Sequence, residues 1–252
     1  MKYTAKYFRD GMPDWKRKKD PIICRIFFRP LSFYTASICA NCGISANIVS
    51  VLSTFVGIAA CVCFALPAKA AAWFGCLFIC LWLLMDCTDG NLARSVKMQP
   101  FGDFVDAMSS YVLVGLLGVT TALNCYTYGG LLFPQGNVYI VLLGALGSSS
   151  DTLMRLIYQK YQANSRDLQS RGIIPSERDV RTEHSSVGSL RVRLEMELGV
   201  AGLIPVLAII CTWLGCLDIL VIYMALYYGG SCLLATSLYT NKALKYLNTP
   251  MK

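Results

Sequence analysis

The chain has 252 residues, of which 55% are hydrophobic, and it carries a formal net charge of +8. This apolar content exceeds what a soluble domain of the same length needs for its core, so composition excludes an ordinary soluble globular protein. The apolar residues also form long blocks, with no charged residue between Arg29 and Lys69 or between Asp106 and Asp151. Blocks of this length are typical of helices that cross a bilayer.

Residues 1–45 predict a basic, amphipathic segment that precedes the first span. They contain no apolar stretch followed by a small-residue cleavage site, so we expect no cleavable signal peptide. Basic and large apolar side chains are interleaved, as in a helix that lies in the membrane interface. The residues concerned are Trp15, Lys16, Arg17, Lys18, Lys19, Ile22, Ile23, Arg25, Ile26, Phe27 and Phe28. We therefore expect contact with membrane lipids and not with nucleic acid.

The remaining blocks predict an all-α integral membrane protein with six transmembrane helices in a domain spanning residues 46–241. A spanning helix needs about 20 apolar residues. On that basis the spans lie near 46–66, 69–86, 104–123, 137–157, 197–214 and 218–240. Turn residues such as Pro67 and Gly215 separate neighbouring spans, and residues 242–252 form a short tail.

The positions of the basic residues indicate the orientation of these spans. On the six-span interpretation, every Lys and Arg except Lys69 falls on the same side of the membrane. Because short cytoplasmic loops are enriched in Lys and Arg, both termini and the 87–103 and 155–195 loops are expected to be cytoplasmic. Of the twelve cysteines, Cys39 and Cys42 have a metal-like spacing, but no second pair accompanies them, so we expect no zinc site.

Carboxylates and small residues gather where the second span ends and the third begins. Asp86 follows an apolar run directly and shares a helical face with Asp89 at i,i+3 spacing. Gly102, Asp106 and Ser110 share a second face at i,i+4 spacing. The two faces can meet across a helical hairpin.

Three carboxylates that converge at a membrane edge would repel one another unless a cation joined them. Oxygen-only ligands favour magnesium, manganese or calcium. Gly90 and Ala93 leave room for a nucleotide or phosphate against the backbone, and Arg94 offers a forked donor to phosphate oxygens. The competing interpretation is that these are helix-end charges in an ordinary loop, but carboxylates inside spans are functional candidates by default.

Together these residues resemble the signature of the CDP-alcohol phosphotransferase family, also called CDP-alcohol phosphatidyltransferases. That signature reads Asp-x2-Asp-Gly-x2-Ala-Arg, a short spacer, and then Gly-x3-Asp-x3-Asp. The residues that match it are Asp86, Asp89, Gly90, Ala93, Arg94, Gly102 and Asp106. The stretch around Asn47 is similar to the family's Pro-Asn-x-x-Thr entry into the first span, and the six-span layout also agrees.

The resemblance implies a homodimer with one cytoplasmic-facing cavity per protomer. Each cavity would hold two divalent ions, Mg²⁺ or Mn²⁺, between the donor's diphosphate and three metal ligands, Asp86, Asp89 and Asp106. The nucleotide and phosphates of the donor would lie against Asn47, Gly90, Ala93, Arg94 and Gly102. An acceptor hydroxyl would then displace CMP.

The sequence departs from the family signature at Ser110, which stands in place of the last aspartate. The family's aspartate is expected to hold metal and to take the acceptor's proton, and serine is neither a comparable base nor a strong ligand. Three explanations remain open: an engineered substitution, a natural pseudoenzyme, or an enzyme with another base. Asp103 is a candidate base, although it lies about 10 Å from Ser110 along an ideal helix. His184 is expected to be solvated in a polar loop.

The 155–195 loop suggests where an acceptor binds, because it is rich in arginine, which grips phosphate through two parallel hydrogen bonds. Arg155, Arg191 and Arg193 lie closest to the expected mouth of the cavity and predict a phosphorylated polyol as acceptor. An ordinary topology signal explains these arginines equally well. Alternatively, Glu195 and Glu197 at the mouth of the fifth span receive a cationic or polyol group.

The leading interpretation is a metal-dependent membrane transferase of phospholipid biosynthesis. It would move a phosphatidyl group from a CDP-linked donor, CDP-diacylglycerol, to the hydroxyl of a small alcohol with or without a phosphate, releasing CMP. An alternative reverses the roles, with a CDP-linked small alcohol donating to a lipid or glycan. A third interpretation is a divalent-cation transporter. Transport sites tend to lie at the bilayer midplane, however, whereas these carboxylates lie near one edge.

Overall fold

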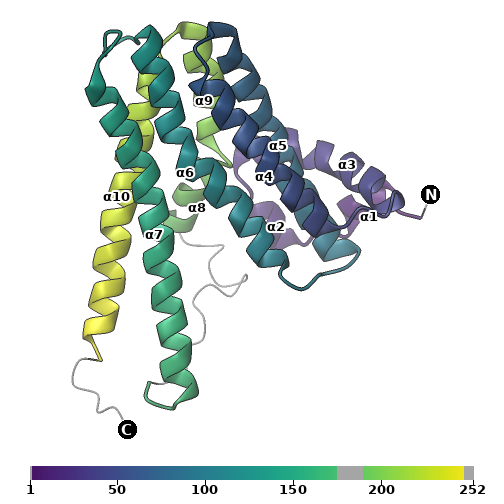
Figure 1. The fold of residues 1–252 in the computed structure, drawn as a ribbon. Coiled ribbons are helices and arrows are strands. Elements are labelled where there is room, and N and C mark those ends of the chain that lie inside the picture. Colours follow the sequence, from purple (N-terminus) through teal and green to yellow (C-terminus); the bar gives the residue numbers. More distant parts are fainter. Residues whose placement is uncertain (1, 175–189, 247–252) are drawn as a thin grey trace.

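A computed structural model describes residues 2–174 and 190–246, except for the side chains of 190–193. Every regular element in these ranges is a helix (Figure 1). Six segments are long and apolar enough to cross a membrane: Ala46–Ala65, Lys69–Ser95, Gly102–Tyr128, Val138–Ser170, Leu194–Leu214 and Leu217–Leu244. The predicted all-α architecture with six spans is therefore confirmed.

Short helices precede the first span, as predicted, but they are several and not one. They are α1 (Ala5–Asp10), α2 (Asp14–Lys19), the π-helical turn η1 (Cys24–Phe28) and α3 (Arg29–Asn41). The breaks coincide with Pro13 and Pro21, because proline lacks an N–H and disfavours a helical residue before it. α3 packs against α5, which places the amino-terminal segment beside one end of the bundle (Figure 1).

The first span lies between the two helices that carry the motif. α4 (Ala46–Ala65) begins at Ser45, whose hydroxyl accepts a hydrogen bond from the Ile48 N–H. It packs along both α5 (Lys69–Ser95) and α6 (Gly102–Tyr128), which touch one another much less. α6 packs against α7 (Val138–Ser170), and α7 packs against α10 (Leu217–Leu244). The two motif helices are thus held together mainly by α4.

The hydrophobic core lies where α4, α5, α6, α9 (Leu203–Leu214) and α10 meet. Its largest fully buried side chains include Trp82, Leu113, Ile204 and Met224. The outer faces of the spans leave other large apolar side chains exposed, such as Trp213 at 74%. Extended apolar surface of this kind indicates contact with lipid and not with water.

Two helices run further than the spans predicted near 69–86 and 137–157. α5 continues past residue 86 to Ser95, and its buried Cys87 and Leu92 extend the packed face. α7 continues past residue 157 to Ser170. Charged residues served as boundaries in the prediction, yet a helix continues past the apolar stretch wherever its backbone hydrogen bonds continue. The motif from Asp86 to Arg94 is consequently helical throughout.

The fifth span, predicted as continuous over 197–214, is interrupted. α8 (Leu190–Leu198) ends before a turn at Gly199, and α9 begins at Leu203. A Cβ atom on Gly202 would collide with the Glu197 carbonyl, so glycine is needed for this turn. The Glu197 carboxylate accepts a hydrogen bond from the Ile22 N–H at 3.1 Å and thereby ties α8 to the amino-terminal segment.

α6 and α7 cross at two glycines that bring their backbones into close contact. A Cβ atom on Gly118 would lie 2.7 Å from the Gly144 carbonyl oxygen, and one on Gly144 would collide with Ala122. Small residues at such crossings allow spanning helices to approach closely. The crossing fixes the position of α7 relative to the motif on α6.

We expect Gly144→Ala to lower the thermal stability of the purified protein, because overpacking costs about 1–3 kcal/mol. That exceeds the gain of about 1 kcal/mol in helix propensity. Gly229→Ala on α10 is the matched control, since a Cβ atom there meets no described atom within 4 Å. Thermal unfolding in detergent should separate the two variants, and equal melting temperatures would contradict the close crossing.

Candidate active site

The three motif carboxylates gather where the end of α5 lies near the start of α6. Asp89 is buried, with 5% of its surface exposed, whereas Asp86 is partly buried and Asp106 is exposed. Asp89 interacts electrostatically with both of the others, and Asp106 also interacts with Asp86. The structure therefore brings together the three residues that the sequence pattern singled out.

Hydrogen bonds from α4 hold these two helix ends in place. The Ser50 hydroxyl donates to Asp89 Oδ2 at 2.5 Å. Three residues further along α4, the Ser53 hydroxyl lies 2.7 Å from that of Ser109 on α6, which also accepts from Trp82 Nε1 of α5 at 2.7 Å. Both groups of hydrogen-bonded side chains are buried. They therefore fix how α4, α5 and α6 are aligned with one another, and they orient Asp89.

The amino-terminal segment supplies positive charge to the carboxylates. Lys16 of α2 and Arg94 of α5 interact electrostatically with both Asp86 and Asp106. Arg29 of α3 interacts with Asp86 as well. Basic side chains from three helices thus surround the acidic cluster.

Arg29 is a structural residue of the site that the sequence reasoning missed. It is buried, and its Nε and Nη2 donate to the two carboxylate oxygens of Asp20 at 2.8 and 3.0 Å. Its Nη1 donates to the Cys87 carbonyl at 3.2 Å and to Asn91 Oδ1 at 3.3 Å. Burial alone would lower the pKa of Arg29, but its interactions with Cys87 and Asp20 raise it above the ordinary value.

This ion pair connects the amino-terminal segment to the motif helix. In the sequence Arg29 counted only as one of many basic residues that set topology, and Asp20 stood beside a run of four basic residues. The only local signal was a single acidic residue between that run and Pro21. Asp20 and Arg29 are nine residues apart, with a helix break between them. No periodic sequence pattern predicts a contact at this spacing.

Gly90 and Arg94 lie against one another on α5. The guanidinium of Arg94 folds back over Gly90, where a Cβ atom would lie 3.0 Å from its Nη1. Its Nη2 donates to Asn91 Oδ1 at 3.1 Å. Arg94 is exposed, and it interacts electrostatically with all three motif carboxylates. Ala93 instead packs against the apolar cluster formed by α1, α3 and α4.

Asn47 donates two hydrogen bonds to the loop that connects the two motif helices. Its backbone N–H donates to Gln99 Oε1 at 3.2 Å and its side-chain Nδ2 donates to the Pro100 carbonyl at 3.0 Å. A Cβ atom on Gly102 would lie 3.5 Å from Asn47 Oδ1. Asn47 therefore has a structural role in this loop, and its predicted contact with the donor stays a prediction.

Ser110, on the next turn of α6 after Asp106, faces an arginine. Its hydroxyl donates to the Ala107 carbonyl at 2.9 Å and lies 3.5 Å from Arg155 Nη1 of α7. Asp103, the candidate substitute base, is exposed in the first turn of α6 and interacts electrostatically with Asp106. The side chains of Arg191 and Arg193, and the whole of His184, lie outside the described residues.

The donor set suits a hard divalent cation. Within residues 2–174 and 190–246, no group of three or more His, Cys, Asp or Glu side chains lies close enough to hold a metal ion. Three carboxylates that repel one another, one of them buried, nevertheless offer oxygen ligands of the kind that Mg²⁺ and Mn²⁺ prefer. Binding a cation would relieve that repulsion.

Comparison with known protein families agrees with this geometry. The model of the CDP-alcohol phosphatidyltransferase family matches residues 43–182, more than half of the chain. The chain belongs to this family. The matched region runs from the start of α4 past the end of α7 and so contains the whole motif. Membership implies transfer of a phospho-alcohol group from a CDP-linked alcohol. A search of curated proteins found no match.

We expect Asp86→Asn, Asp89→Asn and Asp106→Asn each to weaken Mn²⁺ binding by about tenfold or more, since even residues that only orient metal ligands contribute this much. Asp167→Asn is the control, because Asp167 is exposed on α7 and pairs with Arg171. Calorimetric titration of the purified chain measures the affinities. Unchanged affinity in all three motif variants would refute the assignment.

Proposed function

We propose that this chain is a metal-dependent transferase that moves a phosphatidyl group from CDP-diacylglycerol to the hydroxyl of a small alcohol, with release of CMP. The observation that carries the proposal is the group of Asp86, Asp89 and Asp106 at the ends of two spanning helices, beside the exposed Arg94. A diphosphate donor needs such a site, because its own charge must be neutralised before a hydroxyl can approach the phosphorus.

Each motif residue has a task in this proposal. Asp86, Asp89 and Asp106 would hold two divalent ions, which would neutralise the diphosphate and stabilise the departing CMP. Ser50 orients Asp89 through its hydrogen bond. Arg94 binds the donor's phosphates through the donors that Asn91 leaves free, and Gly90, which has no side chain, lets the Arg94 guanidinium lie against the helix.

The transfer forms one bond and breaks another at the same phosphorus. The acceptor oxygen bonds to the phosphorus that carries the diacylglycerol, and the bond from that phosphorus to the CMP oxygen breaks. CMP leaves with the bonding electrons. The acceptor's proton passes to a carboxylate, either Asp106 or Asp103, because Ser110 is not a base of sufficient strength.

The amino-terminal segment supports a lipid donor. It exposes Ile22, Ile26 and Phe27 together with basic side chains, a composition that favours a surface of anionic lipid. The distribution of Lys and Arg supports a cytoplasmic location for both termini and the active site. As the family resemblance implies, we propose that the active form is a homodimer.

We expect Ser110→Asp to raise CMP release by at least about a hundredfold, the usual contribution of a positioned base. The new carboxylate would share a face with Asp106 at i,i+4 spacing. Ser110→Asn is the matched control, since it has the same shape as aspartate without the charge. Equal rates for the unchanged chain and the Ser110→Asp variant would mean that another group takes the proton, and loss of activity in Asp103→Asn would identify it.

A panel of radiolabelled donors tests the direction of transfer. We expect the chain to release CMP from CDP-diacylglycerol and not from CDP-linked small alcohols supplied with diacylglycerol. The reverse result would assign the small group to the donor. Divalent-ion flux in proteoliposomes without any CMP release would indicate a transporter.

A further inference from the structure

One buried amide on the motif helix, that of Asn91, connects two guanidinium groups. Only 2% of Asn91 is exposed. Its Oδ1 accepts from Arg29 Nη1 at 3.3 Å and from Arg94 Nη2 at 3.1 Å. Both donors are charged, and hydrogen bonds of this kind are stronger than those between neutral groups. The family signature specifies no residue at this position, so the role of Asn91 has to come from its contacts.

The surroundings of Asn91 allow only one direction for its amide. Its Nδ2 donates to the Ser32 hydroxyl oxygen at 2.9 Å. The hydrogen of that hydroxyl is already used, because Ser32 donates to the Arg29 carbonyl at 2.8 Å. Ser32 can therefore only accept from Asn91. A reversed amide would turn its N–H groups toward two guanidinium groups, which have donors and no acceptor.

The amino-terminal segment holds the other side of this network. Arg29 donates to both carboxylate oxygens of Asp20, at 2.8 and 3.0 Å, so its guanidinium has little freedom to turn. Ser32 is fully buried on the same helix, α3. Hydrogen bonds thus run from the amino-terminal segment through Asn91 to Arg94, and they set the direction of a side chain on the motif helix.

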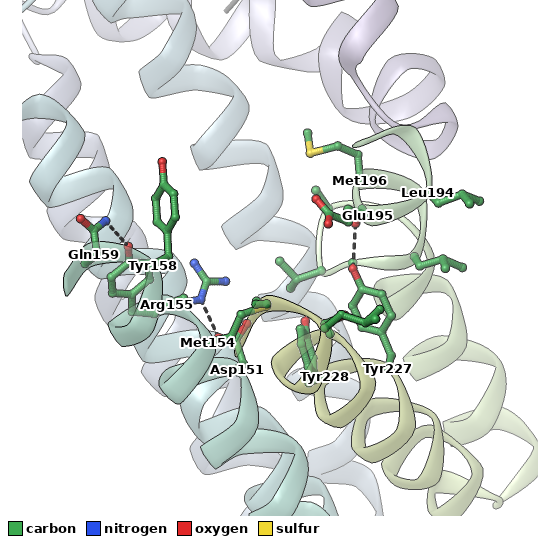
Figure 2. A pocket seen from close by; sticks show the side chains of 18 of the residues that line it. Asp151, Met154, Arg155, Tyr158, Gln159, Leu194, Glu195, Met196, Tyr227 and Tyr228 are labelled. Atoms are coloured by element: carbon green, nitrogen blue, oxygen red, sulfur yellow. Dashed lines mark hydrogen bonds and ion pairs between the residues drawn. The ribbon is translucent and has the colours of Figure 1, made fainter. Parts of the chain in front are cut away.

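The partner of Arg94 in this network is neutral, unlike the partners of two other arginines near the motif. Arg29 pairs with the Asp20 carboxylate. Arg155 pairs with Asp151 in the wall of a cavity between α7, α8 and α10 (Figure 2). An amide oxygen orients a guanidinium as a carboxylate does, but it brings no negative charge. The contact with Asn91 therefore orients Arg94 and does not neutralise it.

We propose that Asn91 is a positioning residue, which holds the Arg94 guanidinium for the diphosphate of the donor while preserving its charge. Ser32 and Arg29 fix the amide that does so. The inference rests on the proposed function, in which Arg94 binds the donor's phosphates. An arginine that is already held in place loses less conformational freedom when the donor binds. The amino-terminal segment then affects donor affinity through Asn91, without touching the donor.

Calorimetric titration of the full chain in detergent with CDP, at one fixed Mn²⁺ concentration, tests this. We expect Asn91→Leu, which has a similar size and no acceptor, to weaken CDP binding about tenfold, the equivalent of one hydrogen bond to a charged group. Asn91→Asp accepts from both guanidinium groups, so the fold should survive. Its negative charge would neutralise Arg94, and we expect CDP to bind at least about tenfold more weakly for that reason.

Thr35→Val is the matched control. It removes a hydrogen bond between the same two helices, from Thr35 on α3 to Thr88 on α5 at 2.6 Å, and leaves the contacts of Asn91 in place. We expect its CDP affinity to equal that of the unchanged chain. A loss of CDP binding in Thr35→Val as large as that in Asn91→Leu would overturn the proposal, because any loosening of α3 from α5 would then have the same effect.

A double-mutant cycle with Arg94→Ala separates positioning from a general effect on the fold. If Asn91 acts through Arg94, Asn91→Leu should change CDP affinity by less than about twofold in the Arg94→Ala background, which is the usual deviation from additivity. The same loss in both backgrounds would overturn the positioning role, and so would unchanged CDP affinity in Asn91→Leu or Asn91→Asp. Unchanged CDP affinity in Arg94→Ala alone would overturn the donor role of Arg94 in the proposed function, and this inference with it.

Discussion

Placing a carboxylate between apolar helices is costly, and the architecture around Asp89 meets that cost with contacts from several elements. The Ser50 hydroxyl on α4 supplies a hydrogen bond, and Lys16, Arg29 and Arg94 bring positive charge close to the acidic cluster. α4 must therefore lie between α5 and α6, and the amino-terminal helices must fold back against α5. A site that binds a divalent ion and a diphosphate needs the same arrangement, because both require preorganised charge in a dry environment.

The buried Arg29–Asp20 pair extends this arrangement beyond the motif. It joins α3 to the backbone of α5 at Cys87 and to the Asn91 side chain, whose neighbour Arg94 faces the proposed donor. The pair is buried, and loss of Asp20 would leave the Arg29 charge in the interior without its carboxylate partner, whereas Asp20 is also paired with Lys16 at 3.3 Å. The amino-terminal segment is thus part of the structure that surrounds the motif.

Ser110 and Arg155 relate the motif to the adjoining cavity. An aspartate at position 110 would face Arg155 and compete with Asp151 for its guanidinium. With serine there, Arg155 keeps its bond to Asp151 while its guanidinium lies over the ring of Tyr111 on α6. The departure from the family signature and the Asp151–Arg155 pair are therefore connected through one side chain.

The sequence by itself determined the six spans and the motif, because blocks of apolar residues and helical spacings are local properties of the chain. Asp86 and Asp89 share a face by their spacing alone, and Asp106 follows on the next helix. Only the tertiary structure decided that α5 and α7 extend past their apolar stretches, that the fifth span breaks at Gly199, and which side chains meet. Ser50 and Asp89, or Ser110 and Arg155, lie far apart in sequence, and no periodicity relates them. Their contacts arise from the way the helices pack, and that packing depends on the whole set of interacting faces at once.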